Sequence, residues 1–182
     1  MSSSHSLNEN QNREAIKEKS HMEVQKNTQK NMVKYEIYKT MHDNLNKAMK
    51  AGFYYEAIFI EYAIFEDRLT SLLKHAGVPY ANKNGKEDKI SRKIDKIRSR
   101  PEFTTKFVRE RLSLDLVEEI QAWTEQRNAF IHNLANTPYD SEQVKQVAKD
   151  GERILKVFKT KSSSVINRFK KDQNEVKREL KS

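Results

Sequence analysis

The stretch FYYEAIFIEYAIFEDRLTSLLKHAG, residues 53–77, decides the fold class. It contains no proline, and its apolar residues recur three or four positions apart, which is the period of an amphipathic helix. One face of that helix carries Ile58, Phe65, Leu69 and Leu72. Phe59 and Ile60 lie well away from that face, so the helix is expected at the centre of a bundle or against a second chain. Gly77 stands where a helix C-cap is expected.

The same helical period extends outward along the chain. The 182 residues include only four Gly and three Pro, which leaves little room for turn-rich β architecture. Further helices are expected at about 30–50, about 90–97, near Phe103 and Phe107, from a Ser113 cap to Leu134, and at about 140–181. The sequence therefore predicts an all-α, up-and-down bundle of four to five main helices.

Residues 1–29 differ from the rest, because they are rich in Asn, Gln, Ser, Lys and Glu with only scattered apolar residues. Such a composition predicts a disordered arm or a frayed helix. Residues 30–182 are then expected to form a single helical domain with a long C-terminal helix.

Composition and net charge limit the classes of function that are expected for this chain. The chain is 36% hydrophobic and 34% charged, with a formal net charge of +9, which favours polyanionic partners such as nucleic acid. It contains no Cys, so disulfides, thiolate catalysis and Cys-based zinc sites are excluded. No apolar run reaches the length of a membrane span, and the polar N-terminus does not resemble a signal peptide. A cytoplasmic protein without membrane contact is expected.

A second stretch, TEQRNAFIHNLAN at residues 124–136, contains most of the candidate catalytic residues. On a helical wheel Arg127 falls about 20° from Ile120, at the centre of the apolar face of its helix. A guanidinium stays charged, so burying it without a partner would be costly. Glu61 lies within the apolar face of the helix at 53–76, so we expect it to face Arg127. A structural salt bridge is the alternative to a pair that orients Arg127 toward a phosphate.

His132 lies about 140° around the helix from Arg127, so the two side chains do not share a face of a regular helix. Asn128 and His132 are four residues apart and do share one. A site that uses both Arg127 and His132 requires the length of the arginine, a distorted helix end or a second chain. A two-fold dimer could combine the residues of both chains in one groove. His132 is also near a helix C-terminus, where the dipole favours imidazolium and acid–base use.

The segment RNAFIH has the spacing R-x4-H, and with its helical setting it resembles the HEPN superfamily. The acidic, aromatic segment at 53–76 looks like the helix that faces this motif in HEPN proteins. The resemblance covers roughly residues 30–160. It implies a metal-independent endoribonuclease that acts as a homodimer with a composite active site, without a cofactor.

Carried over by the motif, Arg127 would bind and stabilise the scissile phosphate, and His132 would act as acid–base or position the 2′-OH. Asn128 would hold the phosphate or His132. Glu61 is our geometric assignment for the facing acid, with Glu66 as the alternative. The resemblance further implies attack by the RNA 2′-OH and a role as a toxin or in defence against phage. An antitoxin or inhibitor would then be a separate RNA or protein.

Basic segments are the candidate RNA contacts. Eight basic and three acidic residues lie between Lys83 and Arg100, and nine and three between Lys156 and Lys181. From the first cluster we select Lys86, Lys89, Arg92 and Lys93 for phosphate contact. The other reading of this chain is a non-catalytic HEPN-like module that binds RNA or protein. A third is a regulatory helical protein in which Arg127 and Glu61 form a core salt bridge. No metal-site motif or glycine-rich phosphate loop is present.

Overall fold

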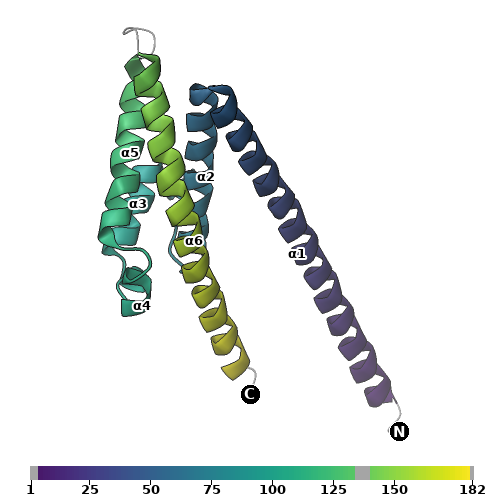
Figure 1. The fold of residues 1–182 in the computed structure, drawn as a ribbon. Helices are drawn as coiled ribbons and strands as arrows, with labels where there is room; N and C mark the ends of the chain where they lie inside the picture. Colours follow the sequence, from purple (N-terminus) through teal and green to yellow (C-terminus); the bar gives the residue numbers. More distant parts are fainter. Residues whose placement is uncertain (1–3, 134–139, 181–182) are drawn as a thin grey trace. The chain divides into compact units, whose positions relative to one another are not determined.

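The computed structural model describes residues 4–133 and 140–180 (Figure 1). Its elements are α1 (Ser4–Ala51), α2 (Tyr54–His75), α3 (Ile90–Ser99), a 3-10 turn (Pro101–Phe103), α4 (Lys106–Arg109), α5 (Leu114–Asn133) and α6 (Ser141–Glu179). No strand occurs within these described ranges, where an isolated bridge pairs Ala81 with Glu87. The predicted all-α class is confirmed. The break expected at 136–140 falls, apart from Asp140, outside the described residues.

The chain divides into two compact units, Met1–Asp43 and Asn44–Ser182. Helix α1 begins at Ser4 and therefore includes most of residues 1–29, for which the composition predicted a disordered arm or a frayed helix. Leu45 and Ala48, which follow the end of the first unit, are the first α1 side chains, among those described, that are buried.

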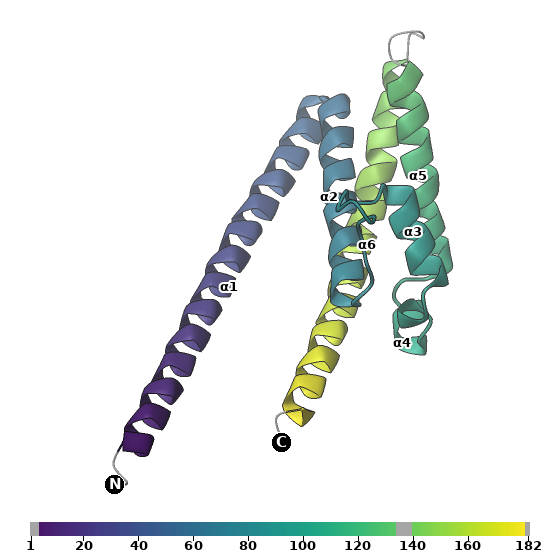
Figure 2. The same ribbon diagram turned by 180° about the vertical axis from the view of Figure 1, so that it is seen from behind.

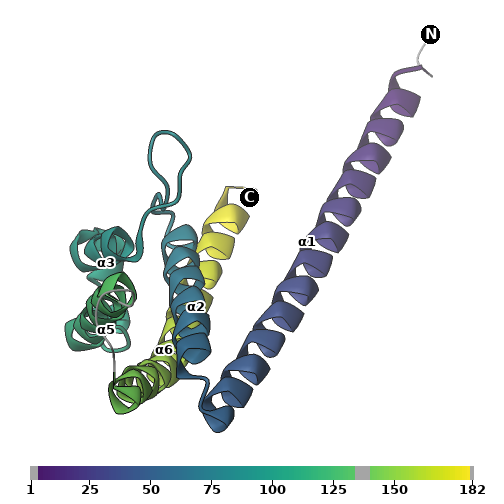
Figure 3. The same cartoon turned by 90° about the horizontal axis from the view of Figure 1, so that it is seen from above.

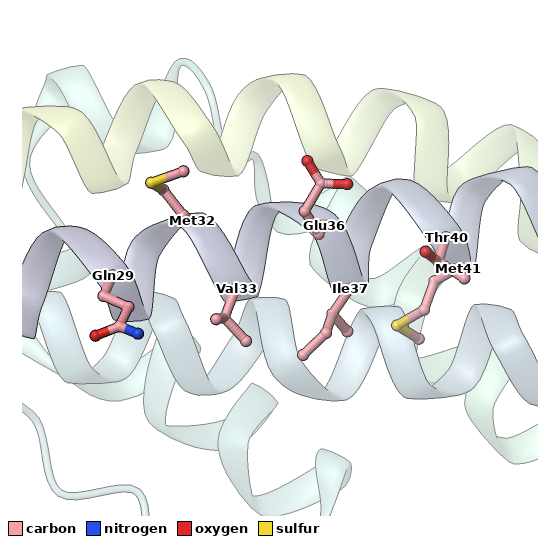
Figure 4. Close-up of a pocket in the computed structure, with 7 residues that line it drawn as sticks. All are labelled: Gln29, Met32, Val33, Glu36, Ile37, Thr40 and Met41. Atoms are coloured by element: carbon pink, nitrogen blue, oxygen red, sulfur yellow. The ribbon is translucent and has the colours of Figure 1, made fainter.

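One side of α1 carries a shallow pocket within the first unit. Seven residues line it: Gln29, Met32, Val33, Glu36, Ile37, Thr40 and Met41. Figure 4 shows that the side chains of Val33 and Ile37 point the same way, as positions i and i+4 of one helix do. Both remain exposed, at 54% and 53%.

The second unit is built around α2. Helix α2 packs along α6 and against α3, and α5 packs against both α6 and α3 (Figures 1 and 2). The predicted core face of α2 is confirmed, since Ile58, Phe65, Leu69 and Leu72 are at most 1% exposed. Away from that face Phe59 is 49% exposed, so the second apolar side of α2 is open in this chain.

Local signals in the sequence set several helix ends. Gly77 has a φ of +74°, which glycine adopts readily, and Val78 donates its N–H back to the carbonyl of Leu73. The hydroxyl of Ser113 accepts a hydrogen bond from the N–H of Leu116 at the start of α5, as predicted. The Asp140 carboxylate accepts from the N–H of Glu142 at the start of α6.

The loop between α2 and α3 projects from the unit in Figure 3 and is held by polar and charged side chains. Within the loop, Asn82 accepts hydrogen bonds from the N–H groups of Asn84 and Lys86. At the end of the loop, Lys96 of α3 forms a salt bridge with the buried Asp88. The pKa of Asp88 is lowered chiefly by that hydrogen bond from Lys96.

Candidate functional site

The candidate site lies between α2 and α5, which run in opposite directions and meet through large side chains. The ring centroids of Tyr55 and Phe130 are 5.2 Å apart, and those of Phe65 and Trp123 are 5.0 Å apart. Along α5, Arg127 lies between Trp123 and Phe130, the α5 members of these two pairs. The antiparallel order explains why residues near the start of α2 meet residues near the end of α5.

Arg127 is held by aromatic rings and by its neighbour. Its guanidinium carbon lies 4.2 Å from the ring centroid of Tyr62 and 5.3 Å from that of Phe59, both of them cation–π contacts. Its Nη1 donates a hydrogen bond of 3.0 Å to Oδ1 of Asn128. Its buried Nε has no hydrogen-bond partner among the described residues. An arginine in the apolar stripe is therefore accommodated by π faces rather than by a carboxylate.

The predicted pair between Glu61 and Arg127 is not formed. Glu61 is completely buried, and neither of its carboxylate oxygens has a hydrogen-bond partner in the described part of the chain. The carboxyl group turns toward α6, where a Cβ built on Gly151 would lie 2.1 Å from Oε2 of Glu61. Because glycine lacks that carbon, α6 can approach α2 closely at this level and the carboxyl occupies the vacant space.

Burial raises the pKa of the Glu61 carboxyl to about 9, with a smaller contribution from the nearby Glu152. A carboxyl group in this environment is protonated at neutral pH. It can neither neutralise Arg127 nor reach solvent. The helical wheel identified Glu61 correctly as a core position, but it could not indicate which neighbouring helix the side chain would face.

Glu66, the alternative facing acid, lies on the side of α2 that carries Tyr62. The two are four residues apart, and the charge of Glu66 contributes to the raised pKa of Tyr62. Burial is the main cause of that raised pKa, and Arg127 opposes it. A carboxylate oxygen of Glu66 lies 3.6 Å from Nζ of Lys93. Of the two acids, Glu66 is therefore electrostatically closer to the Arg127 site.

Lys93 cannot serve as the predicted surface contact for RNA, because it is completely buried. Its Nζ donates hydrogen bonds of 2.7 Å to Glu87 and 2.8 Å to Thr70. The reason is helical phase, since Lys93 precedes Ile97 by four residues and follows Ile90 by three, which places it beside the apolar face of α3. Lys93 thus connects α3 to the loop through Glu87 and to α2 through Thr70.

The other three predicted RNA contacts are exposed. Lys86 lies in the loop after α2, Lys89 is the N-cap of α3, and Arg92 is in the first turn of α3. Arg92 has one ion pair, 3.6 Å from the carboxylate of Asp88. These cations are available to a polyanion in this structure.

His132 is exposed in the last turn of α5. Since α5 is helical through Asn133, the divergence of about 140° between Arg127 and His132 applies, and a distorted helix end does not bring them together. Asn128 links the two positions, because it accepts from Arg127 and lies one helical turn before His132. The structure thus brings together Arg127 and Asn128, while His132 lies on another side of the helix.

Tyr62 and Phe59 were not selected from the sequence as site residues. The available signal was the spacing of Tyr55, Phe59 and Tyr62, at i, i+4 and i+7, which places three aromatic rings along one face of α2. An arginine in the facing helix could have been expected to stack on them.

Three further results bear on the class of protein. No group of three or more His, Cys, Asp and Glu side chains suited to a metal ion occurs among the described residues. No helix in the described ranges has the length and apolar character needed to cross a membrane. Comparisons of the chain with protein-family models, curated proteins and solved structures found no match.

Proposed function

We propose that this chain is a metal-independent endoribonuclease that acts as a toxin or an anti-phage effector. The main support for this proposal is the set of contacts that the Arg127 guanidinium makes. Its guanidinium is held on two rings and by the neutral Asn128, and no carboxylate among the described residues pairs with it. A positioned, uncompensated arginine suits the negative charge that develops on a phosphate during transesterification.

The chemistry is attack by the RNA 2′-oxygen on the adjacent phosphorus. A base takes the 2′-hydroxyl proton, the O2′–P bond forms, and the P–O5′ bond breaks. The 5′-oxygen leaves with a proton from an acid, and a cyclic phosphate remains. His132 is the candidate for one of these proton transfers, because an imidazole can both accept and donate a proton. Arg127 is the candidate for charge stabilisation, and Glu61 has no part because it is buried and faces α6.

The cleavage test uses RNA in the presence of EDTA. We expect the wild-type protein to cut and His132→Ala and Arg127→Lys to lose at least about a hundredfold in rate, the usual scale for an acid–base group or an oxyanion donor. Asn133→Ala, a change at the neighbouring exposed residue, serves as the matched control. Unchanged cutting by His132→Ala would refute the site assignment.

The divergence of Arg127 and His132 supports a homodimer with a composite site. If each site takes Arg127 from one chain and His132 from the other, a mixture of the two inactive variants Arg127→Ala and His132→Ala forms heterodimers with one intact site. Random pairing then restores about a quarter of the wild-type sites, because half of the dimers are mixed and each has one good site of two. No recovery after subunit exchange would contradict the composite site.

A non-catalytic module that binds RNA or protein is the second candidate. The observation that favours it is that one chain alone does not bring Arg127 and His132 to a common side of α5. This candidate predicts a gel shift with RNA, a steep loss of affinity with salt, and no cleavage by any variant.

A further inference from the structure

Two aromatic rings at the Arg127 site are exposed to solvent: Phe59, which lies under the Arg127 guanidinium, and Tyr55, one helical turn before it. Tyr55 is 42% and Phe59 is 49% exposed, and their spacing of four residues puts them on one face of α2. In contrast, Phe65, Phe103 and Phe158 are buried in the same unit. Contiguous exposed apolar surface is a feature of binding sites, whereas apolar residues exposed singly are common on any protein.

These rings and Arg127 form one continuous surface. Tyr55 stacks on Phe130 of α5, and the Arg127 guanidinium lies over Phe59 and Tyr62. The surface therefore presents flat apolar faces immediately beside a positive charge. The part of the chain that the structure describes supplies no anion for this arginine, whose one hydrogen bond goes to the amide of Asn128.

A ligand that matches this surface has a planar ring next to a negative charge. A nucleotide has this combination, since its base stacks on aromatic side chains while its phosphate pairs with arginine. The formal net charge of +9 and the exposed Lys86, Lys89 and Arg92 also favour a polyanion over an apolar protein partner.

We propose that Tyr55 and Phe59 form a base-stacking subsite that holds one or two unpaired bases while Arg127 binds an adjacent phosphate. Because a paired base has its ring faces covered by its neighbours in the duplex, this subsite selects unstacked bases. The inference rests on the proposed function for the choice of nucleic acid as ligand, but binding at the subsite does not require cleavage.

The test measures binding with a strand that cannot be cut. A fluorescein-labelled single-stranded oligodeoxynucleotide lacks the 2′-hydroxyl, so its anisotropy reports affinity alone. We expect Phe59→Leu and Tyr55→Leu each to weaken binding about tenfold, since one stacked base contributes about 1–3 kcal/mol. Phe59→Trp should keep the affinity. Tyr35→Leu, at an exposed aromatic position of α1, is the matched control and should bind as the wild type does.

Two competitors separate stacking from charge. An abasic strand of equal length keeps the phosphates and lacks the bases, so it should compete at least about tenfold less well against the wild type. Against the double variant Tyr55→Leu/Phe59→Leu, it should compete as well as the normal strand does. A fully paired duplex should compete poorly. Equal competition by the abasic and normal strands, or unchanged affinity in Phe59→Leu, would overturn the proposal, as would absence of binding by the wild type.

Two outcomes distinguish this subsite from other properties of the protein. If the wild type binds the strand with the expected ring dependence but never cuts RNA, the proposed nuclease function fails and the subsite stands. If Phe59→Leu instead lowers the sedimenting mass and leaves strand affinity unchanged, the rings belong to an interface between two copies of the chain and the subsite is refuted.

Discussion

Replacement of Glu61 by Gln should stabilise the protein at neutral and alkaline pH, because it removes a buried ionisable group. The Glu61 carboxyl is 0% exposed, and burial raises its pKa from an ordinary 4.5 to about 9. Gln has nearly the same shape and does not titrate. The change therefore tests the electrostatic environment of this position with little effect on packing.

The direction in which the free energy of unfolding changes with pH follows from the number of protons bound by the folded and unfolded states. In the unfolded chain the carboxyl ionises above about pH 4.5, whereas in the folded chain it keeps its proton up to about pH 9. The unfolded state therefore binds fewer protons between these values, and the free energy of unfolding falls as pH rises. The slope is about 1.4 kcal/mol per pH unit, so the group costs about 3 kcal/mol at pH 7 and about 6 kcal/mol at its limit above pH 9.

The assay is urea unfolding followed by circular dichroism between pH 5 and pH 8. Over this range the stability gained by Glu61→Gln relative to the wild type should grow by about 4 kcal/mol, as an order of magnitude. The range avoids the acid side, where Asp88 and Glu87 have lowered pKa values, chiefly through hydrogen bonds from Lys96 and Lys93. Those two groups stabilise the fold above their unfolded pKa, and this contribution is lost as pH falls.

Glu118→Gln, at an exposed position of α5, is the matched control and should show no growing difference. A difference between Glu61→Gln and the wild type that stays constant from pH 5 to pH 8 would refute the reasoning. The variant also bears on function, because a residue that faces α6 should leave RNA cleavage unchanged. A large loss of cleavage in a well-folded Glu61→Gln protein would return Glu61 to the site.

Three other predictions concern packing and the site. Gly151→Ala should lower the free energy of unfolding by about 1–3 kcal/mol although alanine favours helices, because the new carbon would lie 2.1 Å from Oε2 of Glu61. Urea unfolding should show a smaller loss when the same change is made in a Glu61→Ala background. Lys93→Met should cost about 1–2 kcal/mol in the same assay, since Glu87 and Thr70 lose their buried donor, and it should leave the salt dependence of strand binding unchanged. Tyr62→Phe should keep RNA cleavage, whereas Tyr62→Leu should reduce it by about threefold or more, because a ring beneath the Arg127 guanidinium contributes about 0.5–1 kcal/mol or more; equal rates for the two variants would contradict a positioning role.

Helical periodicity alone determined the all-α class, the core face of α2 and most helix limits. It works for α2, α3 and α5 because one face of each helix is buried, and burial imposes the spacing of apolar residues. Gly77 and Ser113 were read correctly because their effect on a helix end is local. Arg127 was identified as anomalous for the same reason, since a charge within an apolar stripe is visible from spacing.

Only the tertiary structure decided what these residues contact. Glu61 and Lys93 both lie near apolar faces, but the sequence does not specify which helix lies opposite each one. The gap at Gly151 draws the Glu61 carboxyl toward α6, and the rings of Phe59 and Tyr62 take the place predicted for that carboxyl at Arg127. A helical wheel gives the direction of a side chain about its own axis, whereas its partner depends on how far apart the helices pack, which residues distant in the sequence determine.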